Sequence, residues 1–331
     1  MDVTLSSRNN RLQNAWKRLA TATNIGPLAA LILLVILLSL VSESFLTVRN
    51  VFNVLNQSSV QLIMALGMTM VIVSGGIDLS VGSVLALTGS VAALASASLE
   101  LHPVLAVAAG LAAGAAIGMV NGFVISRTGI PDFIMTLGML SAARGLALIL
   151  TGGRPVVGIA PGVTLFGSHR VLGFLPAAVL VAAGMVVLMW FILRSTKLGR
   201  CAYAIGGNKE AAKAAGINVG NYKVAFYAVL GLCVAVGGIL QIGRMNAANA
   251  LTGQGWELQV IAIVIIGGTN LFGGEGSIGG TVVGALVLGV ISNGLNLMGV
   301  SSFFQQLFIG VLIVLVVVID QLRRRAASAA T

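Results

Sequence analysis

The feature that most constrains this chain is a series of ten apolar blocks with few charges, separated by short polar segments. Because a spanning helix needs about 20 apolar residues, the series predicts an all-α integral membrane protein with about ten transmembrane helices. The runs are continuous and lack the alternation of barrel strands, which favours helices. The expected spans are residues 25–42, 59–74, 77–98, 103–126, 132–151, 174–193, 222–243, 257–272, 278–298 and 303–320.

Two blocks, the second and the eighth, are only about fifteen residues long, and each runs into a glycine-rich break. We expect these spans to be short or broken. The composition agrees with a membrane protein, since 57% of the residues are hydrophobic and only 8% are charged, against about a quarter in soluble domains. One transmembrane domain is expected over residues 25–321, with polar segments at 1–24 and 322–331.

The first polar segment carries Leu12, Trp16 and Leu19 at helical spacing, which is typical of a helix that lies along the membrane surface. An even number of crossings places both termini on one side, and the basic residues show which side. The positive-inside rule favours cytoplasmic termini, because fourteen basic residues then face inward and four outward. The inner set is Arg8, Arg11, Lys17, Arg18, Arg127, Arg194, Lys197, Arg200, Lys209, Lys213, Lys223 and Arg323 to Arg325; the outer set is Arg49, Arg154, Arg170 and Arg244.

The longest polar interruption is 194–223, which this topology places in the cytoplasm and which holds six of the nineteen basic residues. Its centre, Lys209 to Ala215, predicts a helix of about two turns. Asn208 can cap the start of this helix, and Gly216 can end it in the left-handed conformation. The residues alone leave two interpretations open, an ordinary surface helix and a docking element for a soluble partner.

The glycine-rich breaks form a pair. The first runs from Gly75 to Ser83, and the second from Gly267 to Ser277; both read Gly-Gly-x-Asp/Asn-Leu. Asp78 can cap a new helix, but a carboxylate at membrane depth is costly unless it is paired or wet. Paired helix breaks indicate a transport path, while a capped break near the interface is the alternative.

Polar side chains inside the spans are the other path candidates. Amides both donate and accept, which suits hydroxyl-rich solutes, and they equally tie helices together. The candidates for a translocation path are Gln57, Gln61, Asp78, Ser80, Asn121, Asn270, Asn293 and Asn296.

Two rows of glycine recur every four residues, which lets helix backbones approach closely in lipid. We therefore predict packing seams, with Asn121 as a tie across one of them. The rows are Gly110, Gly114, Gly118, Gly122 and Gly276, Gly280, Gly284.

Catalytic and cofactor motifs are missing from the sequence. There is no GxxxxGK[ST] phosphate loop, no Ser-His-Asp set and no metal cluster, so the chain is expected to be neither an enzyme nor an ATPase, and to bind no metal or cofactor itself. Gly274-x-Gly276-x-x-Gly279 matches a dinucleotide fingerprint by letter only, since its flanks are membrane spans rather than a βαβ unit. The net charge of +10 comes from basic residues that lie mostly between the apolar blocks, a pattern that indicates membrane topology rather than nucleic-acid binding.

Three long stretches, residues 64–89, 198–218 and 265–306, resemble the permease subunits of bacterial ribose-type sugar ABC importers. The resemblance implies an ABC-importer permease fold over 25–321, with 194–223 as the coupling loop. The ATPase-coupling residues that it implies are Asn208, Lys209, Glu210, Ala211, Ala212 and Gly216. It also implies an inner-membrane subunit that pairs with a second permease, homodimeric or a sister subunit. A cytoplasmic ATPase would carry ATP and Mg²⁺ and receive the coupling helix, and a periplasmic sugar-binding protein would dock outside.

The expected function is therefore import of a monosaccharide, with a ribose-like pentose preferred. Two alternatives stay open. A permease of the same architecture for autoinducer-2 or branched-chain amino acids is one, and an ion-coupled secondary carrier is the other. The carrier would need ion-coupling carboxylates, and few lie near the spans: Asp78, Asp132, Glu257 and Asp320.

Overall fold

The computed structural model describes residues 25–301, 303–312, 314–315 and 318. The predicted surface segment 1–24, the tail 322–331 and the end of the last apolar block lie outside the described residues.

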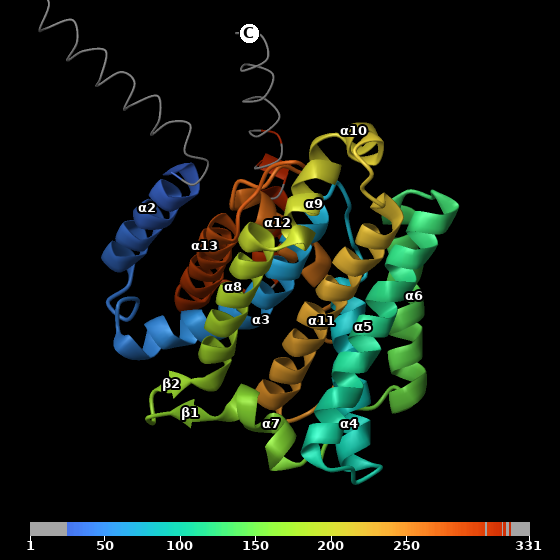
Figure 1. Ribbon diagram of the computed structural model, residues 1–331. Coiled ribbons are helices and arrows are strands. Elements are labelled where there is room, and N and C mark those ends of the chain that lie inside the picture. Colours follow the sequence, from blue (N-terminus) through green and yellow to red (C-terminus); the bar gives the residue numbers. More distant parts are fainter. Residues whose placement is uncertain (1–24, 302, 313, 316–317, 319–331) are drawn as a thin grey trace, which may run out of the picture.

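The described chain is helical apart from one short hairpin (Figure 1). In chain order the elements are α2 Ile25–Val41, α3 Val48–Val73, α4 Val81–Ala97, α5 Pro103–Thr128, α6 Asp132–Thr151, α7 Pro161–Ser168, β1 Arg170–Val171, β2 Leu175–Pro176, α8 Ala177–Ser195, α9 Lys197–Gly207, α10 Lys209–Ala214, α11 Val219–Met245, α12 Trp256–Ile266 and α13 Ile278–Leu297. A further apolar helix, Phe303–Leu312, follows α13.

Within the described residues, six helices are long and apolar enough to cross a membrane: α3, α5, α6, α8, α11 and α13. Four shorter apolar helices accompany them, namely Gly26–Val41, α4, α12 and Phe303–Leu312. Each predicted block therefore contains a helix, and the multi-pass architecture is confirmed. Ten full crossings stay a prediction.

The second apolar block was expected to be short, and this prediction is wrong. Its helix, α3, has 26 residues. Thr47 caps it by accepting from the amide of Asn50, and polar residues such as Asn53 and Gln57 carry the helix beyond the apolar run. The eighth block is short as predicted, since α12 has only 11 residues.

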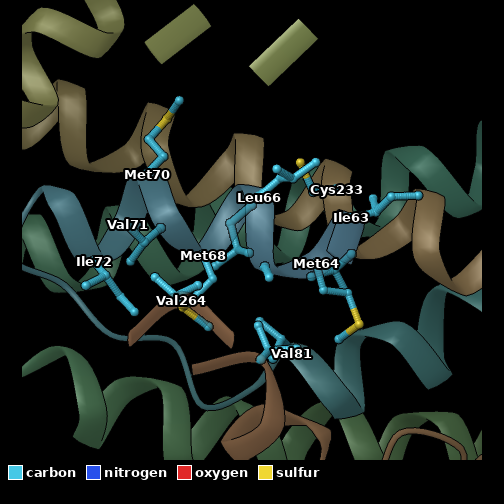
Figure 2. Close-up of a cluster of buried hydrophobic side chains, with 14 of the residues drawn as sticks. Ile63, Met64, Leu66, Met68, Met70, Val71, Ile72, Val81, Cys233 and Val264 are labelled. Atoms are coloured by element: carbon cyan, nitrogen blue, oxygen red, sulfur yellow. The ribbon is translucent and has the colours of Figure 1, made fainter. Parts of the chain in front are cut away.

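Helix α3 lies at the centre of the bundle and is buried on all sides over its second half. Figure 2 shows its side chains Ile63 to Ile72 surrounded by Val81 of α4, Cys233 of α11 and Val264 of α12. The position of α3 in the core is therefore given by its neighbours, since a helix that is apolar all round can lie either in a core or in lipid.

The glycine row of α5 lies against α11 and α4. A Cβ atom on Gly118 would lie 2.8 Å from the carbonyl carbon of Tyr227, and one on Gly122 would lie 2.6 Å from Cα of Val224. Farther along, Gly110 faces the carbonyl oxygen of Thr88 on α4. The predicted packing seam is confirmed, and only glycine allows this backbone approach.

The second row is a seam only in part. Gly280 and Gly284 lie against Gly267 at the end of α12. Gly276, by contrast, precedes α13 and packs in a loop between Thr269 and Val73.

The two ends of the bundle differ. One, called here the α10 end, holds α9, α10, the ends of α3 and α12, and the starts of α6 and α11; the other, the α7 end, holds α7, the hairpin and the end of α4 (Figure 1). The described members of the two predicted basic sets separate between these ends, inner-set residues at the α10 end and outer-set residues at the α7 end. The remaining seven basic residues of the inner set lie outside the described residues.

Two short apolar helices, α4 with 17 residues and α12 with 11, start against each other inside the bundle. A Cβ atom on Gly82, near the start of α4, would lie 2.6 Å from the carboxylate of Glu257, in the first turn of α12, and still nearer to the carbonyl oxygen of Gly253. From this point α4 runs to the α7 end, where Ser96 accepts from the amide of Ala160, while α12 runs to the α10 end. The segment between α3 and α4 therefore re-enters the bundle without being helical.

Candidate functional site

The predicted coupling segment folds as two short helices rather than one helix in a loop. The expected helix is α10, with Asn208 accepting from the amide of Ala211 at 2.9 Å. It ends at Gly216, whose φ is +82°, with Gly216 donating to Lys213 and Ile217 donating to Ala212. These two bonds form the Schellman motif, so both predicted caps are confirmed.

Helix α10 turns most of its surface to solvent. Asn208, Lys209, Glu210, Ala211 and Gly216 are exposed, and Ala212 is buried. Glu210 and Lys213 form an exposed ion pair with a separation of 2.9 Å, which stabilises the turn by about 0.2–0.5 kcal/mol. The segment is thus a rigid, solvent-facing projection, and its role in docking a partner stays a prediction.

Helix α9 was not predicted. Thr196 caps it by accepting from the amide of Gly199, and its buried residues Cys201, Ala202 and Ile205 follow helical spacing. That spacing, read together with the threonine cap, is the signal that could have found it.

The end of α9 lies against both glycine-rich breaks. Gly206 touches the carbonyl oxygen of Val73 at the end of α3, and this oxygen accepts from the amide of Gly274 at 2.9 Å. A Cβ atom on Gly273 would lie 2.9 Å from the amide nitrogen of Gly75. The two breaks, about 200 residues apart in sequence, therefore meet each other directly below the coupling segment.

A cavity of about 240 Å³ lies beside this contact. Its wall includes Asn208, Lys209 and Lys223, together with Phe226 and Phe272. Lys223 binds Asp132 of α6 at 2.7 Å, and the hydroxyl of Tyr227 donates to the same carboxylate at 2.7 Å and lies 3.1 Å from the carbonyl oxygen of Ile77. This network fixes the first break to α6 and α11.

Three of the predicted path residues form one buried cluster. Asp78 accepts from the amide and hydroxyl of Ser80, at 2.7 and 2.6 Å, and from the amide of Asn121 at 3.2 Å. All three side chains are at most 3% exposed. Asp78 therefore binds Ser80, which itself holds the cap position of α4, rather than capping the helix directly as expected. Asn121 ties α5 to the break that precedes α4.

A second group of amides lies on α3 and α12, and one of them, Gln259, borders an open groove. Gln61 of α3 donates to Gln259 of α12, and Gln57, one turn earlier on α3, is exposed. Gln259 also borders a groove of about 310 Å³ between the start of α12, α13 and the helix Phe303–Leu312. The remaining polar residues of this groove, which sequence reasoning missed, are Gln254, Ser292, Gln305 and Gln306. For Ser292, Gln305 and Gln306 the signal was the same as for Gln61, an amide or hydroxyl within an apolar block, whereas Gln254 lies between two blocks.

The remaining three candidates lie apart from these groups. Asn293 is buried and exchanges two hydrogen bonds of 2.9 Å with Asn50 of α3, which makes it a helix tie. Asn296 is exposed and accepts from Gln305 at 2.8 Å, beside the amide-lined groove. Asn270 accepts from the amide of Phe272 in the second break at the α10 end. The eight predicted residues thus do not form a single path.

The chain is a multi-pass α-helical membrane protein, as its long apolar helices show. Its interior holds the buried cluster of Asp78 with Ser80 and Asn121, and an amide pair that joins α3 to α12. Residues 50–317 match the family described as branched-chain amino acid transport system / permease component, and the chain belongs to this family. The multi-pass permease class predicted from the sequence is thereby confirmed.

Similar proteins carry sugar-related names. The chain is 45% identical over 297 residues to the ribose import permease protein RbsC of Escherichia coli (strain K12), covering 88% of this chain and 92% of that protein. It is 41% identical to the RbsC of Bacillus subtilis (strain 168), over 95% and 98% of the two chains. It is 38% identical to the D-allose transport system permease protein AlsC of Escherichia coli (strain K12), over 86% and 87%. No solved structure matches the chain.

Proposed function

We propose that this chain is the transmembrane permease subunit of an ATP-driven importer that moves a monosaccharide, with a ribose-like pentose preferred, from the periplasm to the cytoplasm. The observation that carries the proposal is the 45% identity to a ribose import permease over nearly its whole length. The family description names branched-chain amino acids, and autoinducer-2 would need the same architecture. A sugar is preferred because the similar permeases are named for ribose, D-allose and fructose.

The amide-lined groove supports a sugar as the solute. Amide groups can donate to and accept from the hydroxyls of a sugar without adding charge. The groove is open along one side of a single copy, so a second copy placed against this side would enclose a polar channel. This arrangement makes a homodimer the preferred assembly, since each copy would supply half of the amides.

The α10 end suits a cytoplasmic ATPase partner. Its exposed α10 is capped at both ends, so it can transmit force as a rigid body. ATP and Mg²⁺ would bind to that partner, whose closure would move α10 and rock the two permeases between inward-open and outward-open states. The periplasmic sugar-binding protein would dock at the α7 end. In this orientation the chain sits in the inner membrane with both termini cytoplasmic.

The test is uptake of labelled ribose by proteoliposomes that contain the permease, its ATPase and its binding protein. We expect uptake that stops on ATP depletion, survives an ionophore and is not displaced by leucine. Uptake that an ionophore abolishes and ATP depletion spares would overturn the importer in favour of an ion-coupled carrier. Displacement by leucine would favour the amino-acid alternative.

A matched pair of glycine variants tests the coupling segment. Gly216 and Gly129 both have positive φ at a helix end, with nothing within 4 Å of the Cβ position. Gly216→Val strains the end of α10, and Gly129→Val places the same strain at the end of α5. Only Gly216→Val should abolish uptake, with both variants inserted in the membrane. Equal uptake by the two variants would contradict a coupling role for α10.

A further inference from the structure

A groove of about 460 Å³ lies at the α10 end, between the end of α8, the start of α9 and the start of α13. It is separate from the amide-lined groove and from the cavity beside Gly206. Its lining combines Trp190 and Ile278 with Arg194, Arg200 and Tyr203. Figure 1 shows α8 running up to this end of the bundle, with α9 continuing directly from it.

Two arginines at the rim of this groove are exposed and have no acidic partner among the residues that the structure describes. The guanidinium of Arg194 lies 5.2 Å from the ring centre of Trp190, and Arg200 donates to the carbonyl oxygen of Ser195 at 3.1 Å. The two ion pairs of the described chain, Glu210–Lys213 and Asp132–Lys223, involve neither arginine. Arginine is the side chain whose geometry best matches a phosphate group.

The groove is continuous with a face of α8 that suits lipid chains. Val187, Leu188 and Phe191, just before the arginines, are 65%, 47% and 54% exposed. Trp190, also half exposed, lies between this apolar face and Arg194, the position where tryptophan is enriched at membrane interfaces. A ligand with an anionic headgroup joined to acyl chains would therefore bind both the arginines and the apolar face of α8.

We propose that this groove binds an anionic phospholipid, with its phosphate between Arg194 and Arg200 and its acyl chains along α8. A basic pocket between membrane helices favours an anionic headgroup over a zwitterionic one. An acidic side chain of the ATPase could meet the arginines but would leave the apolar face of α8 uncovered, so a lipid fits better. Assignment of the lipid to the cytoplasmic leaflet rests on the proposed orientation, whereas the binding itself does not.

The test is native mass spectrometry of the full-length, delipidated permease titrated with phosphatidylglycerol or phosphatidylcholine. We expect tighter binding of phosphatidylglycerol, and a loss of about fivefold in its association constant for each of Arg194→Ala and Arg200→Ala. Arg127→Ala is the matched control, because Arg127 also ends a membrane helix at the α10 end and also lies over a ring, that of Phe123, but outside the groove.

Equal affinity for the two lipids, or equal losses in all three variants, would overturn the lipid site. Circular dichroism of each variant separates a lost site from a misfolded chain. Ribose uptake is measured on the same variants, so a chain that transports ribose without preferring phosphatidylglycerol refutes the lipid site and leaves the importer proposal intact.

Discussion

Replacing Gly206 by alanine tests whether α9 transmits movement from the coupling segment to the membrane helices. The new methyl group would overlap the carbonyl oxygen of Val73 and lie 2.6 Å from the amide nitrogen of Gly274. Both atoms belong to backbone that cannot rotate away, and they are hydrogen-bonded to each other at 2.9 Å. Accommodating the methyl group therefore requires α9 to move away from both glycine-rich breaks.

The expected loss has two parts. Overpacking in a close-packed interior costs about 1–3 kcal/mol, and weakening the bond from Gly274 to Val73 costs about 0.5–1.5 kcal/mol more. We therefore expect Gly206→Ala to lower the free energy of unfolding by about 2–4 kcal/mol. Because α9 leads straight into Asn208 and α10, the variant should also lower ribose uptake per ATP hydrolysed in the assembled importer.

The adjacent residue provides the control. Gly207 belongs to the same helix turn, has an ordinary φ and has nothing within 4 Å of its Cβ position. Gly207→Ala should be neutral or stabilise by about 0.4–1 kcal/mol. Thermal unfolding in detergent compares the two variants, and uptake with ATPase activity in proteoliposomes follows. Equal stability and equal uptake of the two would refute the reasoning that Gly206 is a contact through which force passes.

Three further experiments test the packing and the polar ties. Gly118→Ala should lower stability by about 1–3 kcal/mol, because its Cβ would press on the backbone of Tyr227. Gly138→Ala on α6, which has nothing within 4 Å of its Cβ position, should not lower it, and thermal unfolding of both variants measures the difference. Asp132→Asn and Tyr227→Phe should each lower the free energy of unfolding by about 1–3 kcal/mol. Because the Tyr227 hydroxyl donates to the Asp132 carboxylate, the two changes should couple by more than about 0.5 kcal/mol in a double-mutant cycle, and additive losses would contradict the network. Asn293→Ala should cost about 1–3 kcal/mol by leaving the buried amide of Asn50 without its partner, while Asn296→Ala, an exposed site, should stay within about 0.5 kcal/mol.

Local features of the fold could be predicted because their causes are local. Hydropathy locates a helix in every apolar block, and the Asn208 and Gly216 caps depend on residues no more than five positions apart. The start of α3 was missed because Asn53 and Gln57 interrupt the apolar run, although the Thr47 cap marks the first turn of the helix.

The segment before α4 shows where local reasoning fails. Residues 77–80 were read as part of one span, although they precede α4 and are not helical. Their backbone lies against distant groups, such as the hydroxyl of Tyr227, which lies 3.1 Å from the carbonyl oxygen of Ile77. Such a partner lies 150 positions away, so no local pattern predicts it.

The candidate site divides in the same way. The amides were recognised as unusual within apolar blocks, but their partners come from tertiary packing: Gln61 with Gln259, and Asn121 with Asp78. Amide chemistry alone suits both a solute path and a helix tie. Exposure separates the two uses, since Asn293 is buried in a reciprocal pair and Asn296 is exposed near an open groove.

The likeness between the two glycine-rich breaks acquires a physical meaning in the structure. Gly75 and Gly273 touch each other, and Gly206 of α9 lies against both breaks. The short helices α4 and α12, which flank these breaks, also meet at their starts, where Gly82 faces Gly253. The two short helices are therefore connected both through the glycine-rich breaks and at their starts. A close-packed interior transmits displacement rather than absorbing it. We therefore expect a shift of α9 to displace both short helices, together with the Asp78 cluster before α4 and the Gln61–Gln259 pair that joins α3 to α12.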